Sequence, residues 1–337
     1  MRQVVITKAG PPSVLQVQES ADPEAATGQV RVRVKAAGIN FADLMARLGL
    51  YPDAPKLPCV VGCEVSGVVD QVGPSTVGFS VGDRVFGMPH FGGYSDTVVM
   101  PAAQVFRMPD KMSFEEAAAL PVVYLTAHHM LLYTGALRPG MKVLLHSAAG
   151  GVGLAAIDLL QVHGCEIIGT ASPGKHAFLR ERGVQHCVDS SGDVTAAVRA
   201  LGFGGKLDVV CNAVGGKSWK DDYALLGPCG RLIIFGSSTV APGARRSLFA
   251  ILKFLFSYPW WGPLGLMNEN KTVTGVNMGH LFDRLDILRP QFESLVRMYE
   301  AGQIHPFVDK TFAFSDAPAA HQYLHDRKAR GKLLLVP

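Results

Sequence analysis

The sequence predicts an α/β protein with two parts, a compact barrel-like β domain and a doubly wound parallel sheet. Short strands separated by turn residues fill the first third of the chain, as in a small closed β domain. After residue 140, strand-like runs alternate with helical segments, as in a parallel sheet with crossover helices. The length of 337 residues also fits about two domains of roughly 150 residues each.

The composition excludes several classes of protein. Apolar residues make up 48% of the chain and charged residues 18%, which argues against a disordered, charge-rich protein. The net charge is +4, and its 32 basic and 28 acidic residues are mixed along the chain, so no nucleic-acid partner is expected. The chain opens on a strand-like run rather than a signal peptide, which predicts a cytoplasmic protein.

The β part is predicted from alternating and β-branched runs. Residues 30–36 alternate strictly between apolar and polar side chains, as a strand with one wet face does. Three more strand-like runs follow in the first third, and a helix and a strand at the end of the chain are assigned to the same domain. The three strands are predicted at 60–69, 81–87 and 94–99, the helix at about 287–301 and the final strand at 332–336.

The pattern changes near residue 113. Ser113 is followed three residues later by Glu116, a capping box that begins a helical stretch reaching Tyr133. Helical segments then separate buried strand-like runs, and Thr272–Val276 is predicted to be the last strand of the sheet. The earlier strands of that sheet are predicted at 143–146, 166–169, 207–211 and 231–235.

A glycine-rich turn between a strand and a helix is the strongest chemical motif. Aligned to G-x-G-x-x-G, its positions are Ala148, Gly150 and Gly153, so alanine replaces the first glycine. Gly150 lets a pyrophosphate approach the backbone, Gly153 lets the helix pack on the strand, and the helix N-terminus attracts phosphate. A turn without a ligand is the alternative. The residues predicted to bind a dinucleotide here are Ala149, Gly150, Gly151, Val152 and Gly153.

The choice of cofactor is predicted from the segment about 20 residues further on, where NAD sites place an acid on the ribose. Residues 169–175 contain no carboxylate. Ser172 can donate a hydrogen bond to a 2′-phosphate, and Lys175 adds a positive charge. These residues predict NADPH as the cofactor, unless Lys175 is only a solvated loop lysine.

Motifs spread in order over nearly the whole chain carry a family resemblance. They are Ala37–Asp43, Gly49–Pro52, Gly62–Val69, Val81–Val85, Ala148–Gly153 and Gly331–Leu335. Together they resemble the zinc-free quinone oxidoreductase family of the medium-chain dehydrogenases/reductases. Residues 40–51 are especially similar to the vesicle amine transport protein homolog branch, which is described as membrane-associated as well as NADPH-dependent.

The resemblance implies a GroES-like β-barrel catalytic domain, a Rossmann domain and an active-site cleft between them. The domains are expected at residues 1–122 with 277–337, and at 123–276. Zinc-dependent relatives carry Cys at the position of Asn40, His at that of Cys63 and Cys near Val122, and all three ligands are missing. Glu64 alone makes no zinc site, so the chain is expected to bind no metal.

The resemblance also implies site residues. Tyr51 matches the proton donor of similar enoyl reductases, Asn40 can donate its amide N–H to a carbonyl oxygen, and Thr126 lies where the family approaches the nicotinamide. Three structural alternatives stay open: Tyr51 only lines the pocket, Asn40 forms a turn, and Asp43 caps the next helix. The implied further cofactor contacts are Thr170, Asn212, Val214, Phe235, Gly236, Ser237 and Lys332.

The family often has an aromatic residue for the adenosine phosphate after the third strand of the sheet. Residues 188–191 read Val-Asp-Ser-Ser instead. The resemblance therefore implies a lower affinity for NADPH than is usual in the family.

Residues 248–267 form an unusually apolar stretch. Its length suggests a membrane span, but Lys253, two prolines and two glycines interrupt it. Two other interpretations remain open: a helix beside the cleft that lines the pocket or contacts a second copy, or a surface patch that docks on lipid, with Arg245, Arg246 and Lys253 near the headgroups.

The function predicted from these features is NADPH-dependent reduction of quinones or α,β-unsaturated carbonyl compounds, with hydride from the nicotinamide and a proton from Tyr51 or water. The substrate is a small electrophile, and a homodimer is expected through the exposed sheet edge at 272–276. The alternative is a nucleotide-binding adaptor or peripheral membrane protein that keeps a weakly active reductase fold.

Overall fold

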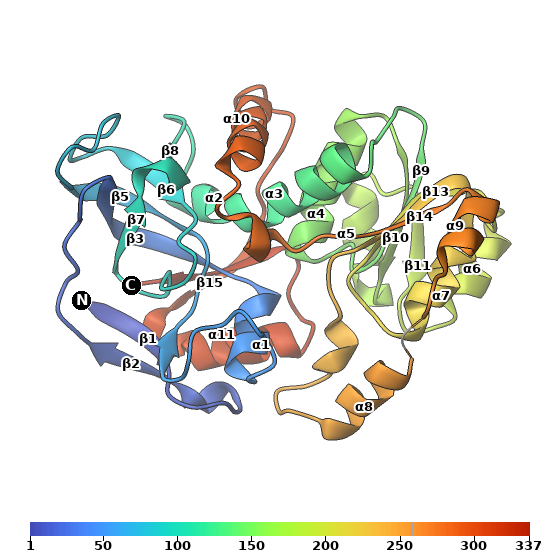
Figure 1. Cartoon of the computed structure of the whole chain (residues 1–337), viewed down its shortest axis with the longest axis horizontal. Coiled ribbons are helices and arrows are strands. Elements are labelled where there is room, and N and C mark those ends of the chain that lie inside the picture. Colours follow the sequence, from blue (N-terminus) through green and yellow to red (C-terminus); the bar gives the residue numbers. More distant parts are fainter. Residues whose placement is uncertain (258) are drawn as a thin grey trace. The chain divides into compact units, whose positions relative to one another are not determined.

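The computed structural model describes residues 1–257 and 259–337, which form two compact units (Figure 1). Unit 1 contains both ends of the chain and comprises Met1–Leu125, Gly243–Arg246 and Met278–Pro337. Unit 2 comprises Thr126–Pro242 and Ser247–Asn277. The mixed α/β class predicted from the sequence is confirmed: unit 1 is built on largely antiparallel sheets and unit 2 on a parallel sheet.

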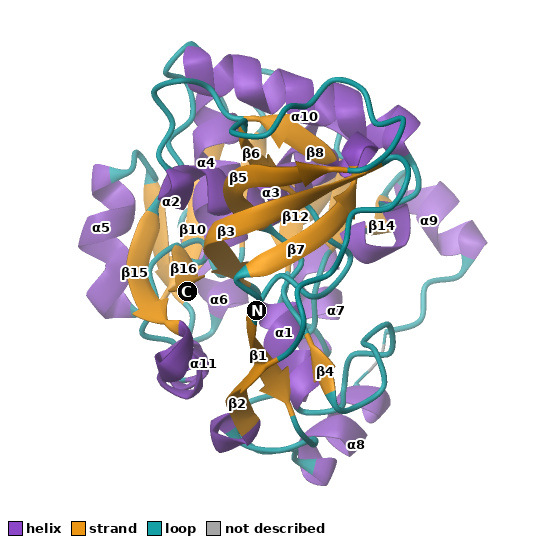
Figure 2. Cartoon of the chain, turned by 90° about the vertical axis from the view of Figure 1, so that its left-hand side faces the viewer, coloured by secondary structure: helices purple, strands orange, loops and turns teal. Residues whose placement is uncertain are grey.

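Unit 1 contains a small sheet, ordered β2-β1-β4, and a larger sheet, ordered β15-β16-β3-β5-β6-β8 with β7 on β3 (Figure 2). The C-terminal strand β16 pairs antiparallel with β3, which returns the end of the chain to this unit as predicted. The strands are β1 (Arg2–Ile6), β2 (Leu15–Glu19), β3 (Gln29–Ile39), β4 (Cys59–Val60), β5 (Val65–Val72), β6 (Arg84–Gly87), β7 (Thr97–Pro101), β8 (Val105–Arg107), β15 (Val308–Ala313) and β16 (Lys332–Val336).

The helices of unit 1 include α1 (Phe41–Arg47), α2 (Phe114–Ala118), α10 (Leu285–Glu300) and α11 (Ala317–His325). The capping box is confirmed, because the Ser113 hydroxyl accepts the N–H of Glu116 at 3.1 Å and the Glu116 carboxylate accepts the N–H of Ser113 at 2.9 Å. The helical stretch predicted from Ala117 to Tyr133 is largely confirmed, but it is not continuous. It breaks before Pro121, which has no N–H to continue the helical ladder, and resumes as α3 (Pro121–His128), followed by a π-helical turn over His129–Thr134.

The sheet of unit 2 is parallel throughout and ordered β11-β10-β9-β12-β13-β14. Numbered along the chain, this is the order 3-2-1-4-5-6 of dinucleotide-binding Rossmann sheets. The strands are β9 (Lys142–Leu145), β10 (Glu166–Ala171), β11 (His186–Asp189), β12 (Leu207–Asn212), β13 (Leu226–Ile234) and β14 (Thr272–Gly275), and the helices between them are α4 (Gly151–Val162), α5 (His176–Glu181), α6 (Val194–Ala200) and α7 (Lys217–Tyr223).

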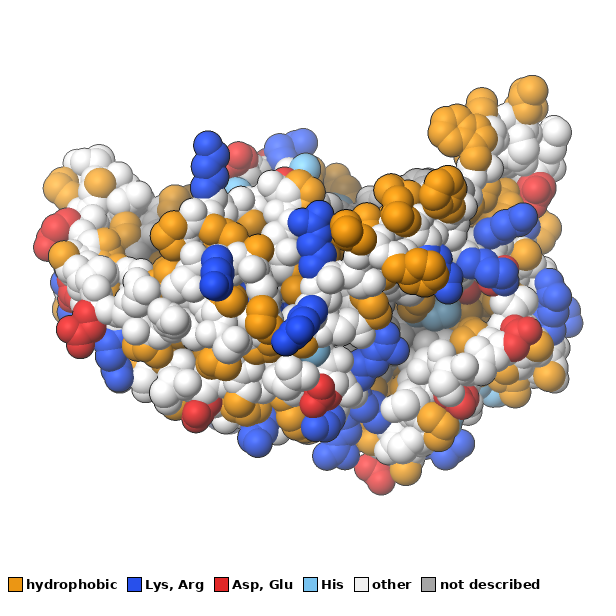
Figure 3. All heavy atoms as spheres, turned by 90° about the horizontal axis from the view of Figure 1, so that it is seen from below, with side chains coloured by type: hydrophobic (Ala, Val, Ile, Leu, Met, Phe, Trp, Pro, Cys, Tyr) orange, Lys and Arg blue, Asp and Glu red, His pale blue; other side chains and the backbone are white. Residues whose placement is uncertain are grey.

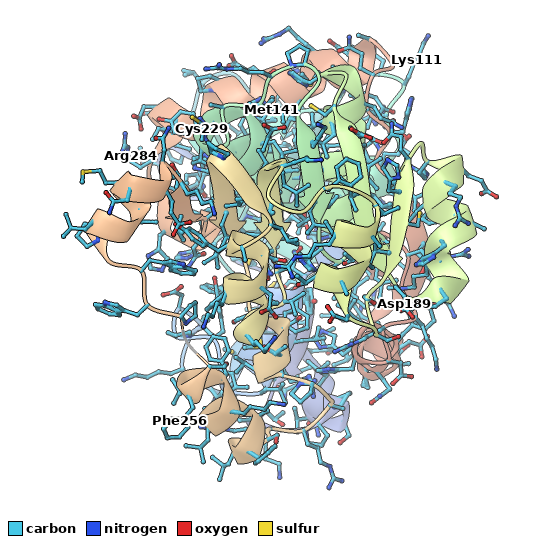
Figure 4. All side chains as sticks on the ribbon, turned by 90° about the vertical axis from the view of Figure 1, so that its right-hand side faces the viewer. Lys111, Met141, Asp189, Cys229, Phe256 and Arg284 are labelled. Carbon is cyan, nitrogen blue, oxygen red and sulfur yellow. The ribbon has the colours of Figure 1, made fainter. Side chains whose placement is uncertain are left out.

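The two edges of this sheet can be followed in Figure 4, where Asp189 marks the carboxyl ends of the strands and Met141 and Cys229 mark the opposite edge. Because all strands are parallel, the turns that follow β9, β10, β12 and β13 meet at the edge marked by Asp189. Open α/β sheets bind ligands at this edge, where the strand order reverses.

Two apolar helices, α8 (Leu248–Phe256) and α9 (Pro263–Glu269), bury none of their residues in the described structure. Trp260 is 94% exposed, and Phe256, which Figure 4 shows at the outer end of α8, is 89% exposed. Hydrophobic side chains gather on the face shown in Figure 3. Tyr258, within this stretch, lies outside the described residues. Among the described helices, none has the length and hydropathy needed to span a bilayer.

Strand β14 closes one side of the unit 2 sheet and pairs only with β13 among the described residues. Its free side presents unpaired N–H and C=O groups, which a second copy can pair across a twofold axis. We therefore propose a homodimer and expect light scattering at micromolar concentration to give about twice the chain mass of 36.0 kDa. A clean monomer would contradict the proposal and leave the apolar helices uncovered.

Candidate cofactor and substrate sites

The glycine-rich turn between β9 and α4 forms an open helix start. Ser147 takes a left-handed conformation with φ of 55°, and Gly150 serves as the N-cap, its N–H bound to Ser147 O at 2.9 Å. A Cβ atom on Gly153 would lie 2.4 Å from Ala148 O, so only glycine lets the helix approach the turn this closely. The predicted packing role of Gly153 thus has a direct steric cause.

The first turn of α4 fits a pyrophosphate. Its first N–H groups have no partner within the helix, and the N-cap glycine has no side chain to occupy them. Gly150, Gly151 and Val152 remain partly exposed, whereas Ala149 is buried. Partly exposed N–H groups at the positive end of a twelve-residue helix favour a bound phosphate.

The segment predicted to bind the 2′-phosphate lies directly after β10. Ser172 is exposed, Lys175 is half-buried, and the Lys175 N–H donates to Ser172 O at 2.9 Å, so both residues lie in one short turn. The prediction of NADPH depends on the absence of carboxylates from residues 169–175. The sheet register, however, sets Asp189 of β11 opposite Ala171. The Ser191 N–H and hydroxyl bind the Asp189 carboxylate and hold its pKa below the usual value.

The side chains of Thr170 and Asn212 are buried and hold the turns in place. The Thr170 hydroxyl accepts the N–H of Ser147 at 3.3 Å, which ties β10 to the glycine-rich turn. Asn212 Oδ1 accepts the N–H groups of Val214 at 2.7 Å and Gly215 at 3.0 Å, and so shapes the turn after β12. We therefore assign both side chains a positioning role at this edge.

Sequence reasoning missed His146 and Asp222 in this network. His146 Nε2 lies 2.9 Å from the Asp222 carboxylate, which also receives the amide of Asn212, and both His146 and Asp222 are buried. Residues 217–222 include two lysines and two aspartates, a composition typical of a solvated helix face, so no local pattern marks Asp222 as a buried acid. The partly exposed Val214, Phe235, Gly236 and Ser237 complete the edge. The Phe235 N–H, for example, donates to Asn212 O at 3.1 Å.

Unit 1 brings Asn40, Glu64 and Lys332 together in one buried cluster. The Asn40 amide donates to Glu64 Oε1 at 2.8 Å, and Lys332 Nζ donates to Asn40 Oδ1 at 2.6 Å. Lys332 also forms an ion pair with Glu64, and the other Glu64 oxygen accepts the N–H of Val122 at 2.8 Å. A Cβ atom on Gly38 would lie 2.3 Å from Glu64 Oε1, which explains the glycine. Glu64 and Lys332 are 0% and 2% exposed.

Tyr51 is a half-buried tyrosine in the same unit. Its pKa is raised to about 12, chiefly by burial and further by the nearby Cys63, Asp53 and Asp43. Within the described part of the chain, no group forms a hydrogen bond with the Tyr51 hydroxyl. Cys63 Sγ donates to His90 O at 3.2 Å, and burial raises the pKa of this thiol well above its usual value. The cluster therefore offers a protonated phenol rather than a thiolate.

The start of α1 explains the neighbouring polar residues. Asn40 is the N-cap of α1, and Asp43, in the first turn of that helix, accepts the Asn40 N–H at 2.8 Å through Oδ2, so Asp43 takes part in the capping box but is not itself the cap. The backbone of Asn40 is extended, with φ of −119° and ψ of 158°, so the alternative that Asn40 forms a turn is wrong and the residue starts α1 instead. Thr126 is buried in α3 and belongs to unit 2, so its predicted role toward the nicotinamide stays a prediction.

A search of the described residues finds no group of three or more His, Cys, Asp or Glu side chains that could hold a metal ion. The Asn40–Glu64–Lys332 cluster places a cation, Lys332, where a metal would need anionic or neutral ligands. That the chain takes no zinc stays a prediction, which elemental analysis of the purified protein tests directly.

Comparisons with known proteins extend over the whole chain. Residues 26–110 match the family model described as "Alcohol dehydrogenase GroES-like domain", and residues 182–335 match the one described as "Zinc-binding dehydrogenase". The synaptic vesicle membrane protein VAT-1 homolog of Mus musculus is 38% identical over 330 residues, covering 96% of this chain and 80% of that protein. A quinone oxidoreductase of Pseudomonas aeruginosa is 33% identical over 342 residues, covering 100% and 99%.

A solved structure shows the same fold. The quinone oxidoreductase of Escherichia coli, complexed with NADPH, superposes with a TM-score of 0.86 at 29% identity and full coverage of both chains. This chain belongs to the medium-chain dehydrogenase/reductase superfamily, in the family that contains quinone oxidoreductases and the VAT-1 homologs.

Proposed function

We propose that this chain is an NADPH-dependent reductase of quinones or α,β-unsaturated carbonyl compounds. Its membership of an oxidoreductase family supports the class of reaction. The observation that carries the substrate class is the Tyr51 hydroxyl, which has no hydrogen-bond partner among the described residues and lies near Asp43, the carboxyl group that accepts the N–H of Asn40. A phenol and an amide suit a flat electrophile whose oxygen gains negative charge during reduction.

NADPH is the cofactor that the unit 2 edge fits. The related quinone oxidoreductase is complexed with NADPH, and the first turn of α4 offers the N–H groups of Gly151, Val152 and Gly153 to a pyrophosphate. We assign Ser172 and Lys175, which lie in one turn after β10, to the 2′-phosphate. When bound, NADPH supplies a hydride from its nicotinamide ring.

The chain's own side chains manage the substrate oxygen and its proton. Tyr51 stays protonated at neutral pH because its pKa is about 12, so it can donate both a hydrogen bond and a proton. Asn40 uses one amide hydrogen for Glu64 and keeps the second for the substrate oxygen. Lys332 holds the amide oxygen of Asn40, which fixes the direction of that free N–H.

The test is NADPH oxidation by the purified protein with a panel of quinones and 2-enals. Tyr51→Phe is expected to lower kcat about 100-fold if the phenol donates the proton. Tyr299→Phe, which removes a tyrosine hydroxyl bound to Glu116, is the control and should keep the activity. If the unmodified protein is active and Tyr51→Phe keeps full activity, water is the proton donor. NADPH binding without turnover of any substrate would favour a nucleotide-binding adaptor over an enzyme.

Lys175→Ala is expected to weaken NADPH binding by about 1.5–3 kcal/mol through loss of a charge-assisted contact. NADH lacks the 2′-phosphate, so its affinity should change little. Fluorescence titration with both cofactors measures the difference, and Lys206→Ala, an exposed lysine just before β12, is the control. An equal loss for NADPH and NADH would rule out a 2′-phosphate contact.

Exposure of α8 and α9 favours a second candidate function, peripheral docking on an anionic membrane surface. Residues 223–268 contain no acidic residue, and Arg245, Arg246 and Lys253 lie among the exposed apolar side chains in the sequence. Because the charged side chains near these helices are positive, this part of the surface complements anionic lipid. The VAT-1 relatives carry "membrane protein" in their names.

Vesicle sedimentation tests the docking. The protein should sediment with phosphatidylcholine vesicles that contain phosphatidylserine, and less with phosphatidylcholine alone. Phe256→Ser should reduce sedimentation, whereas Val77→Ser, an apolar residue 85% exposed in unit 1, should not. Absence of binding to both vesicle types would exclude this function and leave a second protein as the partner of the patch.

A further inference from the structure

A single buried carboxyl group ties together the two backbone segments that carry the unit 1 site. Asp43 is 1% exposed and accepts three hydrogen bonds. Its Oδ2 atom receives the N–H of Asn40 at 2.8 Å and the hydroxyl of Tyr94 at 3.0 Å, and its Oδ1 atom receives the N–H of Gly62 at 3.1 Å. One N–H comes from the end of β3 and the other from the turn that leads into Cys63 and Glu64.

Tyr94 connects this carboxyl group to a second buried residue. Its side chain is 0% exposed, and its hydroxyl lies 3.3 Å from Nε2 of His321 in α11, which is also fully buried. Burial, reinforced by the charge of Arg47, lowers the pKa of His321 well below the usual value, so its ring is neutral. A neutral imidazole can either donate to or accept from the Tyr94 hydroxyl.

The groups around Asp43 come from several elements. Lys332 of β16 favours its charged form, and Cys63, Glu64 and Tyr51 lie in the surrounding loops. Burial outweighs the hydrogen bonds and Lys332, and it raises the pKa of Asp43 to about 6. The carboxyl group therefore changes charge within the range of ordinary assay conditions.

We propose that Asp43 is a positioning residue, whose ionised carboxylate holds Asn40 and the Gly62–Glu64 turn in the arrangement needed for reduction, and that the Tyr94 hydroxyl sets the pH at which this arrangement forms. This inference rests on the proposed reductase function for its kinetic readout. Its structural readout does not need activity.

The hydrogen bonds that Asp43 can form in its two charge states explain this role. An ionised carboxylate only accepts, which suits the three donors that point at it. A protonated carboxyl group brings a hydrogen of its own, so the Tyr94 hydroxyl has to turn toward His321, and the N–H groups of Asn40 and Gly62 lose a charged acceptor. The backbone at Asn40 is then held less firmly, and the side-chain amide of Asn40 loses part of the support that fixes its direction.

The kinetic test is the pH profile of kcat with saturating NADPH and the best substrate of the panel. In the unmodified chain, kcat should rise as pH increases through about 6, the pKa of Asp43. In Tyr94→Phe, the charged form loses a hydrogen bond, so this rise should move upward by about one pH unit. In Asp43→Asn, kcat should be lower at all pH values and the rise should disappear, with KM for NADPH nearly unchanged.

Unit 1 contains a matched control. Glu116 accepts the N–H of the N-cap Ser113 at 2.9 Å and the hydroxyl of Tyr299 at 3.0 Å, which repeats the chemistry of Asp43 at another helix start. Glu116→Gln and Tyr299→Phe should leave the rise in kcat near pH 6 unchanged. The proposal is overturned if this rise stays at the same pH in Tyr94→Phe, or if it persists in Asp43→Asn.

A measurement without turnover separates this inference from the proposed function. The NMR shifts of the Asn40 and Gly62 amides should titrate together near pH 6 in the full chain, and at higher pH in Tyr94→Phe. An inactive protein that shows this titration would contradict the proposed reductase function but support the positioning role of Asp43. Backbone amides of Asn40 and Gly62 that do not titrate together would contradict the positioning role, whatever the activity.

Discussion

Replacing Gly153 with alanine is expected to weaken NADPH binding at least about 100-fold, the effect of losing roughly two charge-assisted hydrogen bonds. The added Cβ atom would lie 2.4 Å from Ala148 O and 2.5 Å from Ser147 O, and both are backbone atoms that cannot yield as a side chain does. The turn and the start of α4 have to move apart, so the N–H groups no longer converge on a phosphate. Fluorescence titration with NADPH measures the loss.

Gly265→Ala provides the control for this substitution. Gly265 lies in the exposed helix α9, where an added Cβ atom meets nothing within 4 Å. This variant should bind NADPH as the unmodified chain does. Thermal melting of both variants separates a local loss of binding from unfolding. Wild-type NADPH affinity in a folded Gly153→Ala protein would show that the cofactor does not use this helix start.

Replacing Lys332 with methionine should lower the free energy of unfolding by about 3–5 kcal/mol, the usual effect of removing one partner from a buried ion pair. Glu64 is 0% exposed, and without Lys332 its carboxylate keeps only the amide of Asn40 and the N–H of Val122 as partners. Asn40 loses the donor to its amide oxygen as well. Denaturant unfolding monitored by circular dichroism measures the change.

A second substitution tests the cause of this instability. Lys332→Met combined with Glu64→Gln removes the unpaired charge and should recover part of the lost stability. Lys217→Met breaks an exposed ion pair with Asp221 and should change stability by less than about 1 kcal/mol. Similar losses in Lys332→Met and Lys217→Met would mean that burial of the pair has no energetic consequence.

Local patterns decided much of what the sequence predicted correctly. The alternation at 30–36, the capping box at Ser113 and the glycine-rich turn each depend on neighbours within a few residues, which the sequence displays directly. The parallel sheet followed from strand and helix alternation, and the Gly153 prediction followed from sterics within one turn. The break before Pro121 is also local, because a proline lacks the N–H that a continuous helix needs at that position.

Only the tertiary structure decided what the polar side chains do, because their partners are distant in the sequence. The implied contact of Lys332 with the cofactor stays a prediction, but its protein partners came only from the fold: Lys332 lies buried against Asn40 and Glu64, 292 residues from Asn40. His146 and Asp222 meet across 76 residues, and Tyr94 and His321 across 227. The sequence by itself determined the fold and the glycine-rich turn between β9 and α4. The charge state and direction of each polar group depend on burial and on long-range partners, which only the folded chain brings together.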